Sequence, residues 1–438
     1  MSFTFCELRR PALFAIVDGN NFFASCERVF NPSLNNKPII VLSSNDGCAI
    51  ARSNEAKALG IAMSAPLHTF SHLIKPHDIR IFSSNFELYG DLSNRMMCIL
   101  KTFTPDVEIY SIDEAFLDLS HLPVIDHDSL ARMMYSTVLK HIGIPITIGI
   151  APTKTLAKVA NRVAKRQRSH HLILKTQEEI NTALQATNVG DVWGVGRALT
   201  PKLKRLGIYT AHDLSKQDPR WARKNLTVTG ERLVRELQGM SCIPFNMEEP
   251  ERQSIQVTRS FGVRLESFND ISEAISVHAT KLGEQLRKRK LVTPLISVFC
   301  RTSPFSNTPY YKGVGITGFD TPTNDTTALI SGAIKALQHA YKSGHAFQSA
   351  GIHAMDLVKE GSSTQKKLFT DQPQLQPFQA RTSPQSIKLI QAIDMLNQRH
   401  GKDTLFWASS GINARHTVKQ SQRSPRYTTR WSEMAWVI

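Results

Sequence analysis

The 438-residue chain is poor in cysteine and has no long hydrophobic run. Its cysteines are scattered and form no C-x-x-C spacing, which argues against a disulfide framework and against a zinc site. No apolar run approaches the roughly 18 residues of a membrane span, and Asp18 ends the first apolar stretch too early for a signal peptide. These absences predict a soluble, intracellular protein. The cysteines are Cys6, Cys26, Cys48, Cys98, Cys242 and Cys300.

Acidic residues are also scarce in comparison with basic ones. The chain has 37 Asp and Glu against 53 Lys and Arg, which gives a formal net charge of +16 and a sequence pI of about 9.6. This balance favours a polyanionic partner such as nucleic acid, although basic proteins without such a partner also exist. With 41% hydrophobic residues, the chain is long enough for about three domains.

Two adjacent carboxylates, Asp113 and Glu114, lie inside the apolar, strand-like run 111–118. Buried charges must be neutralised, and a divalent ion such as Mg²⁺ prefers carboxylate oxygens together with water and phosphate. Side chains alternate along a strand, so both acids reach one ion only if they straddle a hairpin turn. Asp18 ends an earlier apolar run and is the third candidate; the alternative for Asp18 alone is a structural role as the cap of a helix or turn at Gly19. The pattern predicts metal-dependent phosphate chemistry.

Several segments carry a family resemblance. DGNNFFASCE at 18–27, SIDEA at 111–115 and APTKTLAK at 151–158 occur in this order. Together they resemble the Y-family translesion DNA polymerases. NDGCAIARSNEAKALG at 45–60 and SPRYTTRWS at 424–432 resemble the UmuC-type branch of that family. The resemblance extends over nearly the whole chain.

The resemblance implies an α+β fold, a multidomain right-hand polymerase with a palm, small fingers, a helical helix-hairpin-helix thumb, an α/β little finger and a C-terminal tail. The expected boundaries are 12–30 and 80–175 for the palm, 31–79 for the fingers, 176–242 for the thumb, 254–360 for the little finger and 361–438 for the tail. The sequence patterns fit a mixture of helices and strands. They predict strands at 39–42, 144–150, 255–263, 295–300 and 350–357, helices opened by capping boxes at Ser84 and Asp270, and a helix over 325–341.

The resemblance also implies the site residues. Asp18, Asp113 and Glu114 are the expected catalytic acids, which would hold two Mg²⁺ ions together with the backbone carbonyl of Gly19. Phe23 is at the steric-gate position, where a ring under the sugar collides with a 2′-hydroxyl; the alternative is that Phe23 is a simple core residue. The residues expected at the incoming triphosphate are Phe22, Asn54, Lys57 and Lys158. Many relatives have arginine where this chain has Lys57, and a lysine cannot form the bidentate fork of arginine, so a looser triphosphate contact is expected.

Glycines and basic residues predict contacts to the DNA backbone. Gly194 and Gly196 precede a basic helix in the manner of a helix-hairpin-helix, whose free N–H groups bind phosphate. A tight turn before a solvated helix is the alternative. The basic run near residue 288 is a second candidate, with an ordinary basic helix end as the alternative. The residues expected to bind DNA are Gly194, Gly196, Lys202, Arg287, Lys288 and Arg289.

The tail from residue 361 is rich in Gln and Pro at first and reads as a linker. Within it, QKKLF at 365–369 resembles a sliding-clamp peptide, in which the Gln365 amide hydrogen-bonds while Leu368 and Phe369 fill an apolar pocket; a pattern this short also arises by chance. The partners implied by the resemblance are primer-template DNA, dNTPs, the sliding clamp, a UmuD-type dimer and a RecA filament, in the cytoplasm at the nucleoid and with no membrane.

The predicted activity is error-prone, template-directed transfer of dNMP to a primer 3′-hydroxyl opposite damaged DNA, in an SOS-type response. Two other classes stay open. The chain could be a catalytically silent, clamp-recruited DNA-binding scaffold, which the intact acids argue against. It could also be a palm-type nucleotide cyclase, for which a helix-hairpin-helix and a little finger would have no purpose.

Overall fold

The computed structural model describes residues 12–122, 126–247, 251–306, 309–362, 384–401, 403–412 and 418–434. Its described residues form two compact units, which are treated separately. The first unit draws on 1–43, 47–249 and 422–438, and the second on 44–46 and 250–421. The expected C-terminal tail is therefore divided between the two units. Within the described ranges, no helix is long and apolar enough to cross a membrane.

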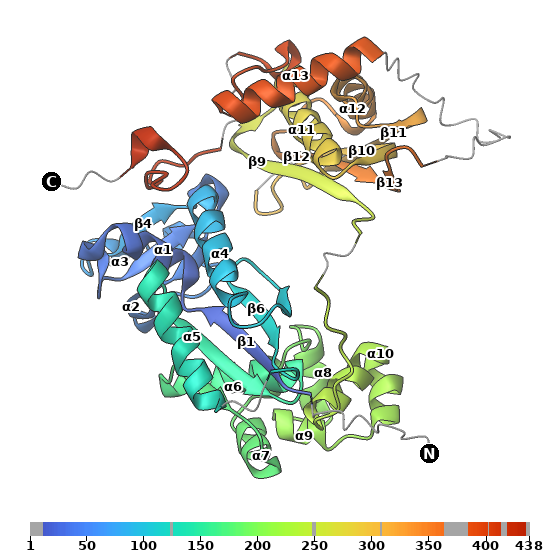
Figure 1. Cartoon of the computed structure of the whole chain (residues 1–438). Helices are drawn as coiled ribbons and strands as arrows, with labels where there is room; N and C mark the ends of the chain where they lie inside the picture. Colours follow the sequence, from blue (N-terminus) through green and yellow to red (C-terminus); the bar gives the residue numbers. More distant parts are fainter. Residues whose placement is uncertain are drawn as a thin grey trace, which may run out of the picture. The chain divides into compact units, whose positions relative to one another are not determined.

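The first unit is built on a five-stranded sheet with the order β5-β6-β1-β7-β8. Two of its neighbouring strands, β1 and β6, are labelled in Figure 1. Its central strand β1 is apolar and buried and pairs antiparallel with both β6 and β7. The strands are β1 (Phe14–Gly19), β5 (Val107–Ile109), β6 (Glu114–Asp118), β7 (Ile146–Ala151) and β8 (His171–Ile173). β5 and β6 are antiparallel around a short turn, which confirms the hairpin turn predicted at Asp113 and Glu114. The predicted strand at 144–150 is also confirmed, although it begins two residues later.

A smaller sheet with the order β3-β2-β4 belongs to the same unit. Its strands are β2 (Ile39–Leu42), β3 (Ala49–Arg52) and β4 (Arg80–Ser83). The predicted strand at 39–42 is confirmed. The helices of this unit are α1 (Phe22–Phe30), α2 (Asn54–Ala58), α3 (Leu67–Ile74), α4 (Phe86–Leu100), α5 (His127–Ile142), α6 (Lys154–Gln167), α7 (Gln177–Gln185), α8 (Leu199–Arg205), α9 (Ala211–Ser215) and α10 (Pro219–Leu237).

The predicted capping box at Ser84 is wrong by one residue. The N-cap of α4 is Asn85, whose side chain accepts a hydrogen bond from the Leu88 backbone N–H at 3.4 Å. Asn is as good an N-cap as Ser because its side-chain oxygen reaches the same free N–H groups. Whether Ser84 or Asn85 becomes the N-cap depends on where the chain leaves β4, and the local sequence does not show this.

Helix α6 packs very closely on β7 at Gly149. A Cβ atom on Gly149 would lie 2.1 Å from the Ala157 carbonyl oxygen and 2.4 Å from the Asn161 amide nitrogen. These are backbone atoms, so the helix itself would have to move. We therefore expect Gly149→Ala to lower the free energy of unfolding by about 3 kcal/mol, as severe overpacking does. Urea unfolding of the full chain measures this change.

Gly90 is the matched control for this substitution, since it lies in α4 and an added Cβ would meet nothing within 4 Å. Gly90→Ala should stabilise the protein by about 0.5–1 kcal/mol through helix propensity. Equal unfolding free energies for the two variants would contradict the close approach of α6 to β7.

The second unit has a sheet with the order β11-β10-β12-β9, and β13 also pairs with β10. Its strands are β9 (Ile255–Leu265), β10 (Leu291–Arg301), β11 (Lys312–Thr323), β12 (Phe347–Met355) and β13 (Val358–Lys359), and its helices are α11 (Phe268–Lys288), α12 (Thr326–Ala340) and α13 (Pro384–His400). The predicted strands and the helix at 325–341 are confirmed within a few residues. α11 and α12 contribute buried apolar residues to one core with the sheet.

The predicted start of α11 at Asp270 is wrong. The N-cap is Ser267, whose hydroxyl accepts from the backbone N–H groups of Asn269 and Asp270 at 3.1 and 3.4 Å. Asp270 lies instead in the first turn of the helix, where a carboxylate is favourable because of the helix dipole.

Candidate active site

Strand pairing brings the predicted acids together. In the β1–β6 register, Asp18 lies opposite Glu114, and partners in such a ladder have Cα atoms about 4.5–5.5 Å apart. Asp113 immediately precedes Glu114 and lies in the turn, where its carbonyl oxygen accepts a hydrogen bond from the Gly19 N–H at 2.8 Å. The Ser111 hydroxyl donates to Asp113 Oδ1 at 2.7 Å and accepts from the Glu114 N–H at 3.0 Å. Ser111, which the sequence interpretation left without a role, thus fixes the turn that presents these acids.

Two lysines of α6 neutralise these acids. Lys158 Nζ lies 2.9 Å from Glu114 Oε2, and Lys165 Nζ lies 2.5 Å from Asp18 Oδ1. Burial raises the pKa of Asp18 to about 7, although Lys165 acts in the opposite direction. Burial also acts to raise the pKa of Glu114, but hydrogen bonds from Asp18 and Lys158 outweigh it, and the pKa lies below the usual value. Lys165 was not predicted as a site residue, though its position two helical turns after Lys158 indicates a shared face.

The acids fit a divalent cation by their chemistry. In the part of the chain that the structure describes, no group of three His, Cys, Asp or Glu is arranged as a metal site, and lysine ammonium groups contact two of the acids. Carboxylate oxygens at the ends of neighbouring strands are nevertheless the donors that Mg²⁺ prefers. A buried carboxylate whose pKa is raised is also stabilised in its charged form by a bound cation.

The predicted triphosphate residues of α2 meet at Asn21. Lys57 Nζ donates to Asn21 Oδ1 at 2.5 Å, and Asn21 Nδ2 donates to Asn54 Oδ1 at 3.0 Å. Burial lowers the pKa of Lys57, as do the nearby charges of Arg52 and Lys165. Asn21 caps α1 in the left-handed region at φ 48° and was missed by the sequence interpretation, as was Arg52. Lys57, Asn54 and the start of α1 therefore form one polar cluster.

Phe22 and Phe23 open α1 but have different environments. The Phe22 side chain is buried in the core, and its backbone N–H belongs to the first turn of α1, whose N–H groups have no partner within the helix. The Phe23 ring is half-buried and stacks on the Tyr89 ring of α4, with centroids 4.5 Å apart and planes 15° apart. It also meets the edge of Phe86 at 5.8 Å. One face of Phe23 is therefore fixed against α4.

The glycine turn before α8 is found where the sequence predicts it. Gly194 has a positive φ of 91° and is exposed, as is Gly196. Lys202 lies in α8, and its Nζ donates to the Asn225 carbonyl oxygen at 2.5 Å. This cation is therefore tied to α10 in the structure.

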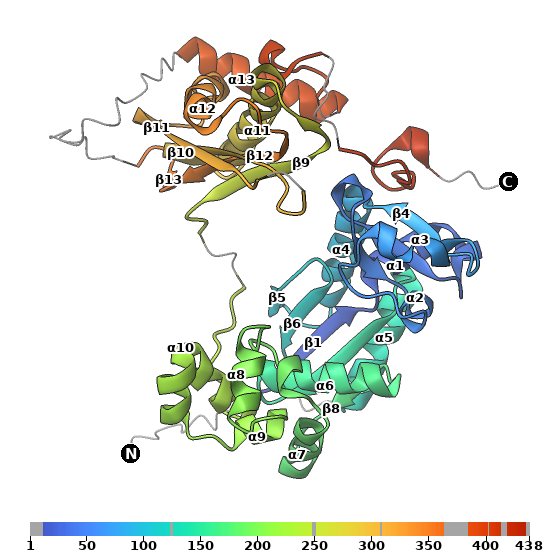
Figure 2. The same cartoon turned by 180° about the vertical axis from the view of Figure 1, so that it is seen from behind.

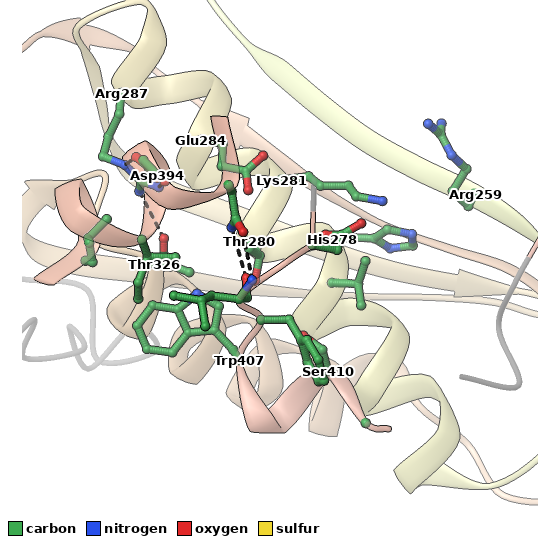
Figure 3. Close-up of a pocket in the computed structure, with 18 of the residues that line it drawn as sticks. Arg259, His278, Thr280, Lys281, Glu284, Arg287, Thr326, Asp394, Trp407 and Ser410 are labelled. Atoms are coloured by element: carbon green, nitrogen blue, oxygen red, sulfur yellow. Dashed lines mark hydrogen bonds and ion pairs between the residues drawn. The ribbon is translucent and has the colours of Figure 1, made fainter. Parts of the chain in front are cut away.

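In the second unit, Arg287 is occupied by protein contacts. Its guanidinium forms a bidentate pair with Asp394 of α13 at 2.7 and 2.8 Å and donates to Thr326 Oγ1 at 2.9 Å. The pair lies at a cavity of about 410 Å³ that is lined by residues of α11 and α13 and by Trp407. Figure 3 shows Arg287, Asp394 and Trp407 around this cavity. Arg287 thus joins three helices, whereas Lys288 and Arg289 are exposed. The predicted clamp-binding residues Gln365, Leu368 and Phe369 lie outside the described residues.

Family models cover most of the chain. The model described as "impB/mucB/samB family" matches residues 17–162, and its C-terminal domain model matches 252–368. A third model, described as a domain of unknown function, matches 388–437.

Curated proteins and a solved structure agree with these matches. The chain is 41% identical to Protein UmuC of Salmonella typhimurium over 429 residues, which cover 96% of this chain and 99% of that protein. It is 39% identical to Protein SamB of the same species over 428 residues, with the same coverage. DNA polymerase IV of Lactococcus lactis is 28% identical over 80% of this chain and 94% of that protein. A Y-family DNA polymerase chimera has a TM-score of 0.64 at 20% identity and covers 80% of this chain and 100% of that chain, which shows a shared fold.

Proposed function

Because the chain belongs to the impB/mucB/samB family and is a Y-family DNA polymerase of the UmuC type, we propose that it performs error-prone translesion synthesis. It would add dNMP to a primer 3′-hydroxyl opposite damaged DNA in an SOS-type response. The observation that supports this proposal best is the register that pairs Asp18 with Glu114 and places Asp113 in the adjoining turn. A cluster of half-buried carboxylates, one of which has a raised pKa, is typical of a functional site.

In this proposal, Asp18, Asp113 and Glu114 would hold two Mg²⁺ ions together with the Gly19 carbonyl. Such ions, when bound, activate a hydroxyl nucleophile and stabilise a pyrophosphate leaving group. The protein then needs no strong side-chain base, and its residues act by positioning. Ser111 holds the Asp113 carboxylate in place through its 2.7 Å hydrogen bond.

The triphosphate would lie between α1, α2 and α6. The first-turn N–H groups of α1, including that of Phe22, point toward an anion, as helix N-termini do. Lys57 and Lys158 supply cations on two sides, and Asn54 supplies an amide held by Asn21. A single lysine binds phosphate as a point charge, which supports the expected looser contact.

Replacing Lys57 with alanine should raise KM for the incoming dNTP by about tenfold with a smaller change in kcat, because the lost charge contributes mainly to ground-state binding. Steady-state insertion of a single nucleotide measures both constants. Lys57→Arg should restore most of the affinity. Lys75, exposed at the end of α3, is the matched control, and Lys75→Ala should leave KM unchanged. Equal KM values for the Lys57→Ala and Lys75→Ala variants would show that Lys57 does not bind the triphosphate.

The wider partner set is also part of the proposal. Gly194, Gly196 and Lys202 would contact the DNA backbone in the first unit, and Lys288 and Arg289 in the second. Gln365, Leu368 and Phe369 would bind the sliding clamp. The similarity to UmuC supports a UmuD-type dimer as partner, and a RecA filament completes the set. Binding to chromosomal DNA would place the protein in the cytoplasm at the nucleoid.

Primer extension by the purified full chain with Mg²⁺ tests the proposed function. Templates with and without an abasic site should be used, both alone and with a UmuD-type dimer and RecA filament. Template-directed extension past the lesion is the expected result. DNA binding without extension in every mixture would favour a scaffold, and conversion of free nucleotides to cyclic products without primer would favour a cyclase.

A further inference from the structure

The segment Gln422–Met434, which is the part of the last described range that belongs to the first unit, is called the C-terminal strap below. Figure 2 shows it beside β4 and α4. The Ser83 N–H donates to the Gln422 carbonyl oxygen at 3.0 Å, and the Gln422 N–H donates to Ser83 Oγ at 3.0 Å. The Asn85 side-chain amide donates to the carbonyl oxygen and to Oγ of Ser424 at 3.1 and 3.0 Å. The strap is therefore joined to the end of β4 and to the N-cap of α4.

The strap also contacts a buried carboxylate, Glu27 of α1, which is only 2% exposed. The Ser424 hydroxyl donates to Glu27 Oε1 at 3.0 Å, and the Tyr89 hydroxyl donates to the same oxygen at 2.6 Å. Burial raises the pKa of Glu27, and these two hydrogen bonds offset part of that rise. A buried carboxylate depends on such donors because water cannot replace them. Ser424 thus stabilises a group that solvent does not reach.

Glu27 lies on the same face of α1 as Phe23. Phe23, Glu27 and Phe30 follow one another at the i, i+4 and i+7 spacing, which aligns side chains along one side of a helix. Tyr89 stacks its ring on Phe23 and bonds its hydroxyl to Glu27. Tyr427 of the strap stacks on Phe30, with centroids 4.7 Å apart and planes 9° apart. α4 and the strap therefore hold this face at three successive positions.

The strap has its own internal support. Arg426 donates to both carboxylate oxygens of Glu433, at 2.6 Å for the shortest contact, and these bonds lower the pKa of Glu433 to about 2. Arg423 and Arg426 also lie 3.7 and 3.6 Å from Glu87 in the first turn of α4. Ion pairs within the strap and between the strap and α4 therefore hold the loop that carries Ser424 and Tyr427.

We propose that the C-terminal strap is a built-in support for the sugar-selecting ring of Phe23, and that Ser424 is a positioning residue that acts through Glu27 and Tyr89. This inference rests on the proposed function and on the steric-gate role that the family resemblance implies for Phe23, which we include in the proposal. A phenylalanine gate has no phenol to hydrogen-bond, so its selectivity depends on how firmly the ring is held. The proposal assigns a role in nucleotide selection to the last part of the segment matched by the domain of unknown function.

The test compares Ser424→Ala with Ser424→Thr, which keeps the hydroxyl, in the full chain. The readout is sugar discrimination, the ratio of kcat/KM for a dNTP to that for the matching rNTP. Ser424→Ala should lower this ratio by about fivefold, the loss expected from one ordinary hydrogen bond. Ser424→Thr should keep the wild-type ratio. Ser432, exposed in the same strap, is the matched control, and Ser432→Ala should also keep it.

A double variant separates positioning from general stability. If the strap acts through the gate, Ser424→Ala should not change discrimination further once Phe23→Ala is present, because the effects of substitutions at coupled positions are not additive. An unchanged ratio in Ser424→Ala, or an equal loss in the presence and absence of Phe23, would overturn the inference. An unchanged ratio in Phe23→Ala alone would instead overturn the proposed gate. Melting temperatures near that of the wild type in all variants would exclude unfolding as the cause of a changed ratio.

Discussion

Replacing Asp113 with alanine is expected to slow primer extension by at least about a thousandfold, equivalent to ~4 kcal/mol of transition-state stabilisation. Asp113 lies in the β5–β6 turn. Its carbonyl oxygen accepts a hydrogen bond from the Gly19 N–H, and its carboxylate is oriented by a hydrogen bond from the Ser111 hydroxyl. Its carboxylate is one of three proposed to hold the metal ions, and alanine supplies no oxygen donor. Single-turnover insertion of one correct dNTP at saturating Mg²⁺ measures the loss directly.

The loss should be confined to the chemical step. Binding of primer-template DNA by Asp113→Ala should stay near wild type, since the predicted backbone contacts lie elsewhere. Asp91 is the matched control: it lies in the same unit, in α4, and pairs with Arg95 at 2.9 Å on the helix surface. Asp91→Ala should extend primers at the normal rate, because an i,i+4 pair on a helix surface contributes only about 0.3–0.5 kcal/mol to stability and this pair is not part of the proposed site. Wild-type extension by Asp113→Ala and Glu114→Ala variants would refute the catalytic assignment.

The features predicted best from the sequence are those with a local signal. Apolar runs predicted β1 and β7, and the need to place Asp113 and Glu114 on one side predicted the hairpin. The structure also brings Asn54 and Lys57 together through Asn21, a contact that depends on how α2 lies beside α1. Local patterns therefore predicted the strands that carry the acids, whereas the connecting residue needed the folded chain.

β11 was missed because its sequence looks unfavourable for a strand. Gly313 and Gly315 lower strand propensity, yet a Cβ at these positions would lie 1.8 and 1.9 Å from backbone oxygens of α12. The glycines are there because a helix later in the chain passes over them. This requirement arises from tertiary packing, and the sequence of the strand alone does not reveal it.

The strap contact is the most extreme case of this limit. Ser424 and Glu27 are separated by 397 positions in the sequence, and neither residue is unusual for its local surroundings. SPRYTTRWS contributed to the family resemblance, but nothing in it predicted a contact with α1. Only the fold shows that Ser424 and Tyr89, whose ring stacks on the proposed gate, bond to the same buried carboxylate.

Replacing Phe23 with alanine is expected to raise ribonucleotide insertion by about a hundredfold relative to dNTP insertion, equivalent to ~2.7 kcal/mol of lost discrimination. The ring is half-buried, and Tyr89 covers one of its faces at 4.5 Å. It therefore cannot easily move aside when a 2′-hydroxyl approaches, and exclusion rests on ring bulk. Competition between one dNTP and its rNTP in single-nucleotide insertion measures the ratio.

Phe23→Tyr is the matched control, because it keeps the ring and adds only a hydroxyl. It should retain the wild-type ratio, whereas Phe23→Leu should lie between tyrosine and alanine if volume alone decides. dNTP insertion by Phe23→Ala should fall much less than the ratio, since the acids and Lys158 on the neighbouring elements are unchanged. If all three variants kept the wild-type ratio while Phe23→Ala lowered the melting temperature, Phe23 would be a core residue that packs Tyr89 and would have no part in sugar selection.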